Sequence, residues 1–154
     1  YYDYSEKLIE EIFLKIKNNF LNKGYQLIFI PSLRTPQNII NKAKEYFDKN
    51  QIIITSVDKK AYLSSLRLAN HIVVTCDSTS MISEAAMTGK PIYIAQMPSI
   101  KKNLRFENFF ESFRMLNITR DLENSVENWY YEKLSETDKI SSYIKDQLKN
   151  YDFS

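Results

Sequence analysis

Glycine, cysteine and histidine are scarce in this chain of 154 residues, and each scarcity excludes a class of site. The two glycines, Gly24 and Gly89, are too few for a glycine-rich phosphate-binding loop of either common type. A single cysteine, Cys76, and a single histidine, His71, leave no disulfide framework and no Cys/His zinc site. Phosphate binding in this chain would therefore depend on hydroxyl groups, basic side chains and backbone N–H groups.

Long apolar runs and blocks of basic residues are also absent from the sequence. No apolar run reaches the roughly 18 residues that a membrane-spanning helix needs, and no signal peptide is visible. The net charge is +2, and no window resembles the basic stretches of nucleic-acid-binding proteins. We therefore expect a cytoplasmic protein without a nucleic-acid partner. Because the chain begins at Tyr1 without Met, we also expect an upstream segment.

Short apolar segments alternate with longer amphipathic ones along the sequence. Nearly continuous apolar runs predict buried strands at 25–30, 51–55, 71–75 and 92–95. Helical periodicity predicts helices at 5–22, 36–49, 59–69, 78–88, 104–115 and 136–150. Ser5 is the expected N-cap of the first helix and Gly24 its end, and Pro36 is expected to open the second. The segment 116–135 is interpreted as loop or short helix.

This alternation predicts the fold class. Short apolar strands separated by helices imply βαβ units and hence a parallel sheet. Right-handed crossovers then place helices on both faces of that sheet. The predicted fold is therefore α/β, a Rossmann-like parallel sheet with helices on both faces. The length suits one domain, and no internal repeat or linker interrupts it.

Hydroxyl side chains follow several of the predicted strands. In open parallel sheets, ligands bind beyond the carboxyl ends of the strands. The segments at those ends are 31–36, 55–58, 76–80 and 96–99. The first of them holds Arg34 between Ser32 and Thr35, where a guanidinium and a helix start could bind a phosphate. In the alternative interpretation, Ser32 and Thr35 cap the helix opened by Pro36 and Arg34 is solvated.

The segment 76–80 is the stronger candidate for an anion site. Asp77 or Ser78 can cap the following helix, which leaves the N–H groups of Thr79, Ser80 and Met81 directed at a ligand. The helix dipole favours an oxyanion at this position. The segment could therefore be both a helix cap and an anion site.

Glu84 lies one helical turn after Ser80 on the same face of this predicted helix. A carboxylate accepts hydrogen bonds from a pair of sugar hydroxyls, so Glu84 could hold a ribose while the helix start holds a diphosphate. In the alternative interpretation, Glu84 is an exposed helix residue, and Ala85 and Ala86 pack on the sheet.

Two other residues have competing interpretations. Cys76 could be a nucleophile, but a cysteine at a strand end is more often a small buried residue. Trp129 could stack on a base, or it could pack where the chain crosses to another domain.

Four motifs in order carry a resemblance to a known family. The first is Ser32-Leu33-Arg34-Thr35-Pro36, and the second is Asp77-Ser78-Thr79-Ser80-Met81-Ile82-Ser83-Glu84-Ala85 followed by Thr88-Gly89-Lys90-Pro91-Ile92-Tyr93. The third comprises Arg105-Phe106-Glu107-Asn108-Phe109-Phe110 and Ile118-Thr119-Arg120, and the fourth is Trp129-Tyr130-Tyr131-Glu132-Lys133-Leu134-Ser135-Glu136-Thr137. These motifs resemble the mitochondrial-fission ELM-type family, whose GT-B-like, glycosyltransferase-related members are often labelled nucleoside-diphosphate-sugar epimerases.

The resemblance implies a two-domain GT-B architecture in which residues 1–154 are the C-terminal half, a single donor-binding domain. An N-terminal domain outside this chain would supply the acceptor contacts and the catalytic base. We therefore expect a nucleotide-sugar-binding domain of a GT-B-like glycosyltransferase that is inactive as a fragment, and the sequence identifies no catalytic residue in it. The alternatives are a non-catalytic scaffold in membrane or division-site organisation and a nucleotide-sugar epimerase.

The resemblance also implies which residues contact the donor, a nucleoside-diphosphate sugar. Glu84 is expected to bind the ribose. The residues expected at the diphosphate are Ser32, Arg34, Thr35, Ser78, Thr79 and Ser80, and Asp77 and Met81 are expected as further substrate-binding residues. No metal and no further cofactor are expected, because GT-B sites use helix dipoles and basic residues instead. The expected partners are the nucleotide sugar, the N-terminal domain and an acceptor at a membrane surface, which would make the cytoplasmic protein membrane-associated.

Overall fold

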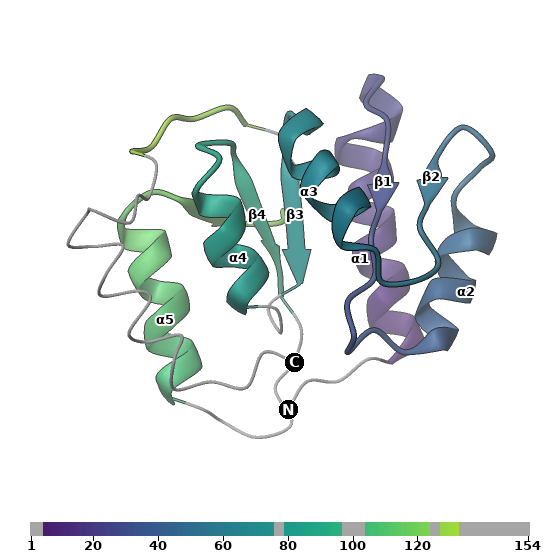
Figure 1. Cartoon of the computed structure of the whole chain (residues 1–154), viewed down its shortest axis with the longest axis horizontal. Coiled ribbons are helices and arrows are strands. Elements are labelled where there is room, and N and C mark those ends of the chain that lie inside the picture. Colours follow the sequence, from purple (N-terminus) through teal and green to yellow (C-terminus); the bar gives the residue numbers. More distant parts are fainter. Residues whose placement is uncertain (1–4, 76–78, 97–103, 124–126, 133–154) are drawn as a thin grey trace. The chain divides into compact units, whose positions relative to one another are not determined.

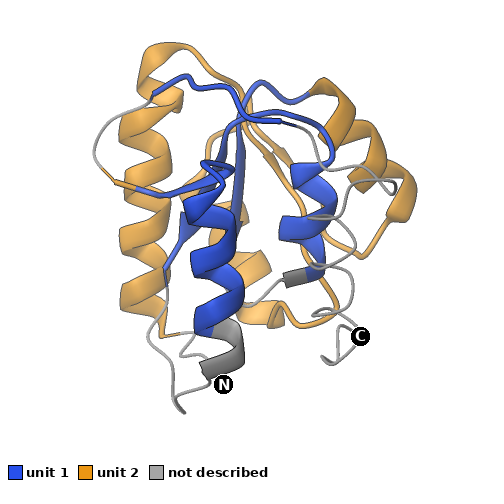
Figure 2. Ribbon diagram, turned by 90° about the vertical axis from the view of Figure 1, so that its left-hand side faces the viewer, with its two compact units in different colours: residues 1–3, 69–122, 127–153 blue, residues 4–68, 123–126, 154 orange. Residues whose placement is uncertain are grey.

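The computed structural model describes residues 5–75, 79–96, 104–123 and 127–132. These residues belong to two compact units (Figure 2). The described part of unit 1 lies within Ala69–Leu122 and 127–132, and that of unit 2 lies within 5–68 and at Glu123. The predicted helix at 136–150 lies outside the described residues.

Unit 2 combines helices with a two-stranded parallel sheet (Figure 1). Its elements are α1 (Glu6–Asn19), the 3₁₀ helix η1 (Leu21–Lys23), β1 (Ile28–Phe29), α2 (Gln37–Tyr46), β2 (Ile52–Ile53) and α3 (Lys59–Leu68). In the sheet, Ile28 lies opposite Ile52. Helix α1 packs against α2, and the ring centroids of Phe13 and Phe47 are 5.0 Å apart. Apolar packing between helices therefore forms the core of this unit.

Individual residues determine where helices α1 and α2 begin and where the helical segment after α1 ends. The Ser5 hydroxyl accepts a hydrogen bond from the backbone N–H of Leu8 at 3.3 Å, which confirms the predicted N-cap. Helix α1 ends earlier than predicted, at Asn19 with Phe20 as its C-cap, and Gly24 instead ends the following 3₁₀ helix η1 in the left-handed region at φ +93°. Pro36 is the N-cap of α2 and is extended, with ψ 147°. The helical residues therefore begin at Gln37, and the expectation that Pro36 opens the helix from within is wrong.

Unit 1 is built on a three-stranded parallel sheet in the order β3-β4-β5 (Figure 1). Its elements are β3 (Ile72–Thr75), α4 (Thr79–Ala86), β4 (Ile92–Ala95), α5 (Leu104–Met115) and β5 (Thr119–Asp121). All four residues of the central strand β4 are buried. Helix α4 packs against β3 and β4, and α5 packs against β5.

The predicted α/β fold with parallel strands is confirmed, because the strands pair in parallel in both sheets and helices flank them. The strands are divided between two sheets, and β1 and β2 are shorter than the predicted runs. The expectation that β2 is buried is wrong, since the Ile52 side chain is 44% exposed. A strand side chain is buried only where another layer packs on its face of the sheet, and Ile52 lies on an exposed face.

Strand β5 was not predicted, because 116–135 was interpreted as loop or short helix. Its three residues are Thr119, Arg120 and Asp121, and they carry no apolar pattern. They become a strand by pairing with β4, and the ladder continues with the Leu122 N–H donating to the Ile94 carbonyl at 2.9 Å. Residues 119–121 therefore form a strand because they pair with β4, and not because of their own strand propensity.

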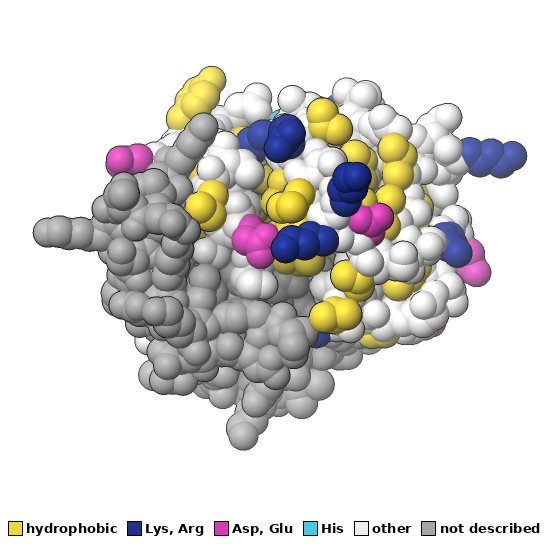
Figure 3. All heavy atoms as spheres, in the orientation of Figure 1, with side chains coloured by type: hydrophobic (Ala, Val, Ile, Leu, Met, Phe, Trp, Pro, Cys, Tyr) yellow, Lys and Arg dark blue, Asp and Glu magenta, His cyan; other side chains and the backbone are white. Residues whose placement is uncertain are grey.

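The surface carries charges of both signs. On the face drawn in Figure 3, basic and acidic side chains of the described residues are interspersed with hydrophobic ones. Among the helices in the described ranges, none combines the length and hydropathy needed to cross a membrane.

Phe113 provides a test of the core of unit 1. Its side chain is fully buried, and its ring centroid lies 4.7 Å from that of Phe109. We expect Phe113→Ala to lower the free energy of unfolding by about 3–5 kcal/mol, because it removes buried apolar area and leaves a cavity. Urea denaturation measures this change. The control is Met115→Ala on the same helix, where the side chain is 79% exposed and the expected loss is below about 0.5 kcal/mol. Equal losses in the two variants would contradict the assignment of the core.

Candidate functional site

The strands of unit 1 end together at one edge of the sheet. Thr75 of β3 lies opposite Ala95 of β4, and Ile94 of β4 lies opposite Asp121 of β5. We call the strand ends at Thr75, Ala95 and Asp121 the carboxyl edge. Parallel α/β sheets bind their ligands at this edge, so the residues that follow these strands are the candidates for a site.

Helix α4 begins shortly after β3 and contributes predicted site residues. Ser80 and Met81 in its first turn are half-buried, and Glu84 is exposed. Thr79 is the first helical residue of α4. Asp77 and Ser78, the predicted capping residues, lie outside the described residues, as does Cys76. The structure therefore brings Ser80, Met81 and Glu84 together on one helix that starts beyond a strand end.

The buried face of α4 holds the helix against the sheet. Ile82, Ala85 and Ala86 have no exposed surface. The small alanine side chains allow the backbone of α4 to approach β3 and β4 closely, as was expected for Ala85 and Ala86. This packing leaves Glu84 on the outer surface of the helix, where a ligand can reach its carboxylate.

The turn after α4 is held by hydrogen bonds of the Thr88 hydroxyl. This hydroxyl donates to the Ala85 carbonyl at 2.6 Å and accepts from the Lys90 N–H at 3.1 Å. Between them Gly89 adopts φ +75°, a left-handed conformation that strains other residues. The Tyr131 hydroxyl donates to the Lys90 carbonyl at 2.5 Å. The connection from α4 to β4 is therefore well defined.

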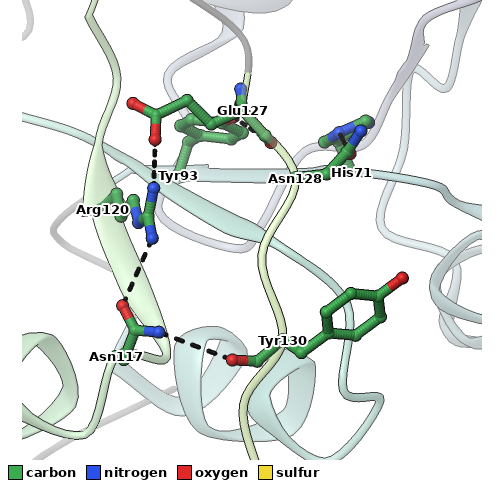
Figure 4. A network of polar contacts seen from close by, with 7 residues as sticks. All are labelled: His71, Tyr93, Asn117, Arg120, Glu127, Asn128 and Tyr130. Atoms are coloured by element: carbon green, nitrogen blue, oxygen red, sulfur yellow. Dashed lines mark hydrogen bonds and ion pairs between the residues drawn. The ribbon is translucent and has the colours of Figure 1, made fainter.

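The segment 127–131, which we call the strap, contacts residues at and near the starts of the strands (Figure 4). The Tyr93 hydroxyl donates to the Glu127 carbonyl at 2.8 Å and accepts from the Glu127 N–H at 2.7 Å. The Asn128 side chain contacts His71 Nε2 at 2.9 Å. His71 precedes β3 and Tyr93 lies near the start of β4. The strap therefore covers the amino-terminal side of the strands.

Arg120 of β5 and Trp129 of the strap form the centre of these contacts. The Arg120 guanidinium pairs with the Glu127 carboxylate and lies 4.2 Å from the centroid of the Trp129 ring. The Trp129 ring is buried and meets Tyr93 edge to face at 5.1 Å. Trp129 therefore packs in the protein, and its interpretation as a base-stacking residue is wrong.

The Ser32–Thr35 turn belongs to unit 2. The Thr35 hydroxyl accepts from the Ser32 N–H at 2.9 Å, and the Ser32 hydroxyl accepts from the Arg34 N–H at 3.2 Å. Helix α2 has no side-chain cap, so the alternative in which Ser32 and Thr35 cap it is wrong. Both hydroxyls close the turn that precedes the helix instead. The Arg34 side chain is exposed at this turn.

The carboxyl edge also gathers three residues that were not predicted as site residues, namely Gln96, Arg114 and Asp121. Asp121 Oδ1 accepts hydrogen bonds from Gln96 Nε2 and from Arg114 Nη2, both at 2.9 Å. Arg114 Nη1 donates to Glu111 Oε2 at 3.0 Å. Gln96 opens the segment 96–99, which the sequence placed at a strand end, but no role was predicted for it. The contacts of Asp121 depend on β5, which was not predicted.

Among the residues that the structure describes, acidic, histidine and cysteine side chains form no cluster suited to a metal ion. Within the described ranges, no group of three or more such residues is arranged to hold a metal ion.

Tyr131 provides a pH-dependent test of the contact between the strap and the α4–β4 turn. Burial raises the pKa of its phenol from 10.0 to about 12, and a hydrogen bond with Thr88 opposes part of this shift. Below pH 10 both the folded and the unfolded chain keep the proton, but between about 10 and 12 the unfolded chain loses it first. The stabilisation by Tyr131 should therefore disappear over this range.

The free energy of unfolding of the wild type and of Tyr131→Phe measures this effect. We expect the difference between them to be largest near neutral pH and to shrink as the pH rises above 10. Tyr130→Phe is the matched control, because Tyr130 is 92% exposed. A constant difference between wild type and Tyr131→Phe across this range would contradict the burial of the phenol.

Comparisons with known proteins relate the chain to one family. A family model described as mitochondrial fission ELM1 matches residues 1–148. An uncharacterized protein, RP120, from Rickettsia prowazekii (strain Madrid E) is 34% identical over 144 residues, covering 86% of this chain and 40% of that protein. The mitochondrial fission protein ELM1 of Arabidopsis thaliana is 30% identical over 122 residues, covering 76% of this chain and 28% of that protein.

The chain thus spans less than half the length of either of these relatives. No solved structure matches it at a significant level. Because the family model covers nearly the whole chain, the assignment does not rest on a short motif. The chain belongs to the mitochondrial fission ELM1 family.

Proposed function

We propose that the chain is the nucleotide-sugar-binding domain of a GT-B-like glycosyltransferase. The observation that supports this most directly is the position of Glu84. It is exposed on α4, one turn after Ser80, on a helix that begins beyond a strand end of a parallel sheet. The α/β fold and the membership of the ELM1 family agree with the proposal.

The proposed contacts follow from the chemistry of the helix start. The first N–H groups of α4 have no carbonyl partners within the helix, and the helix dipole favours negative charge beside them. A diphosphate is therefore suited to this end, with the hydroxyl of Ser80 as a further donor. Glu84, about 6 Å further along the helix axis, would accept hydrogen bonds from the two ribose hydroxyls.

Other parts of the proposal concern residues and domains away from α4. Ser32, Arg34 and Thr35 of unit 2 are predicted from the sequence to contact the diphosphate, and this stays a prediction. The proposal includes no metal and no further cofactor, because helix N–H groups and a guanidinium balance the phosphate charge. The acceptor site, which we propose to face a membrane surface, and the catalytic base belong to another domain of the full-length protein in this proposal.

A second candidate function is a non-catalytic scaffold. The observation in its favour is the name of the Arabidopsis thaliana relative, mitochondrial fission protein ELM1. Such a role would keep the fold without a need for nucleotide binding. Measurement of nucleotide binding therefore separates the two candidates.

Calorimetric titration of the chain with UDP, GDP and ADP tests the proposal, and Glu84→Ala tests the role of Glu84. We expect this variant to bind the nucleoside diphosphate about tenfold or more weakly, because hydrogen bonds to a charged group are lost. Binding of inorganic pyrophosphate, which has no ribose, should be unchanged.

The matched control is Glu45→Ala, which removes another exposed helical glutamate and should leave nucleotide binding unchanged. If the folded wild-type chain binds none of the nucleotides at millimolar concentration, the donor-site proposal is wrong. Circular dichroism shows whether each variant is folded.

A further inference from the structure

A group of polar side chains lies at the carboxyl edge beside the residues assigned to the nucleotide. Gln96 directly follows β4, Asp121 ends β5, and Arg114 lies in the last turn of α5. Gln96 and Arg114 both donate to the same oxygen, Oδ1 of Asp121, at 2.9 Å. Residues from three elements therefore meet at one carboxylate.

These contacts leave two oxygen atoms open as acceptors. Among the described residues, no side chain or backbone group donates a hydrogen bond to Oδ2 of Asp121 or to Oε1 of Gln96. The Asp121 side chain is 35% exposed and Gln96 is an exposed residue, so both side chains are accessible to a ligand. The contacts with Arg114 and Gln96 hold Oδ1 of Asp121 in place. They therefore also restrict the position of Oδ2, the second carboxylate oxygen.

The chemistry of this group favours a hydroxyl-bearing ligand. The single guanidinium of Arg114 pairs with two carboxylates, those of Glu111 and Asp121, so the group carries net negative charge. Net negative charge disfavours a phosphate. Hydroxyl groups donate hydrogen bonds, and a carboxylate oxygen beside an amide oxygen can accept from two of them.

Gln96 and Asp121 lie at the same edge of the sheet as the start of α4. Strands β3, β4 and β5 are neighbours in one sheet, and α4 starts beyond the end of β3. Adjacent strands lie about 4.8 Å apart, so Gln96 and Asp121 lie about 5–10 Å along the carboxyl edge from the end of β3. If a diphosphate binds at the start of α4, the sugar attached to its far phosphate would therefore lie within reach of Gln96 and Asp121.

From this arrangement we infer that Gln96 and Asp121 bind hydroxyls of the transferred sugar, with Arg114 as the residue that positions Asp121. The inference rests on the proposed function and adds the residues that recognise the sugar. An ion pair that only fastened α5 to β5 would need Arg114 and Asp121 but not Gln96. The Gln96 contact orients a second acceptor towards the same edge.

The test compares each nucleoside diphosphate with its sugar derivative, using UDP with UDP-glucose and GDP with GDP-mannose in calorimetric titrations. The measured quantity is the sugar increment, the ratio of the Kd of the diphosphate to that of its sugar derivative. We expect an increment above one for at least one pair in the wild type. Gln96→Met and Asp121→Asn should each reduce the increment about tenfold, or abolish it, because each removes hydrogen bonds to the sugar.

The controls separate a loss of sugar contacts from a loss of structure. In both variants the Kd of the free diphosphate should be unchanged. Glu111→Gln removes the other carboxylate partner of Arg114 and should leave the increment unchanged. Gln96 is exposed, so Gln96→Met keeps the fold and carries the test if Asp121→Asn lowers the unfolding temperature.

Each result decides the inference. An increment of one for both pairs in the wild type, or a full increment in Gln96→Met, overturns the inference and leaves the proposed function standing. Failure of the folded wild type to bind any nucleoside diphosphate overturns the proposed function and the inference with it. Loss of the increment in Gln96→Met with unchanged diphosphate binding supports both.

Discussion

The pairing of β4 with a strand on each side is the constraint on which unit 1 depends. All four residues of β4 are buried, so water cannot satisfy its backbone N–H and C=O groups. β3 and β5 supply the missing partners in parallel ladders. Because all three strands run in the same direction, their carboxyl ends meet at one edge. The residues that follow them are therefore close together although they are distant in sequence.

The two ends of this sheet differ in how their polar groups are satisfied. At the amino-terminal side, the strap occupies them: Tyr93 both donates to and accepts from the Glu127 backbone, and Arg120 pairs with Glu127 over the Trp129 ring. At the carboxyl edge, Glu84 is exposed and Asp121 keeps an oxygen that receives no hydrogen bond from the described residues. The protein thus closes one end of the sheet with its own chain, and the other end offers groups suited to a ligand.

Strong local patterns were enough to predict most elements. Strand β4 and helix α5 have the predicted bounds, since a continuous apolar run and a clear helical periodicity leave few alternatives. Glu84 could be proposed as a site residue because its spacing from Ser80 follows from helix geometry alone. Asp121 and Arg114 could not be proposed, because their meeting requires β5 to pair with β4 and α5 to pack on β5.

The sequence by itself determined the alternation of helices and strands, the cap at Ser5 and the family. These depend on residues that are close in the chain or on motifs that can be read without coordinates. Only the tertiary structure decided that polar Thr119–Asp121 is a strand, that Trp129 is buried, and that Gln96, Arg114 and Asp121 share one carboxylate. Each of these results from contacts between distant segments, whose energies local propensity does not contain.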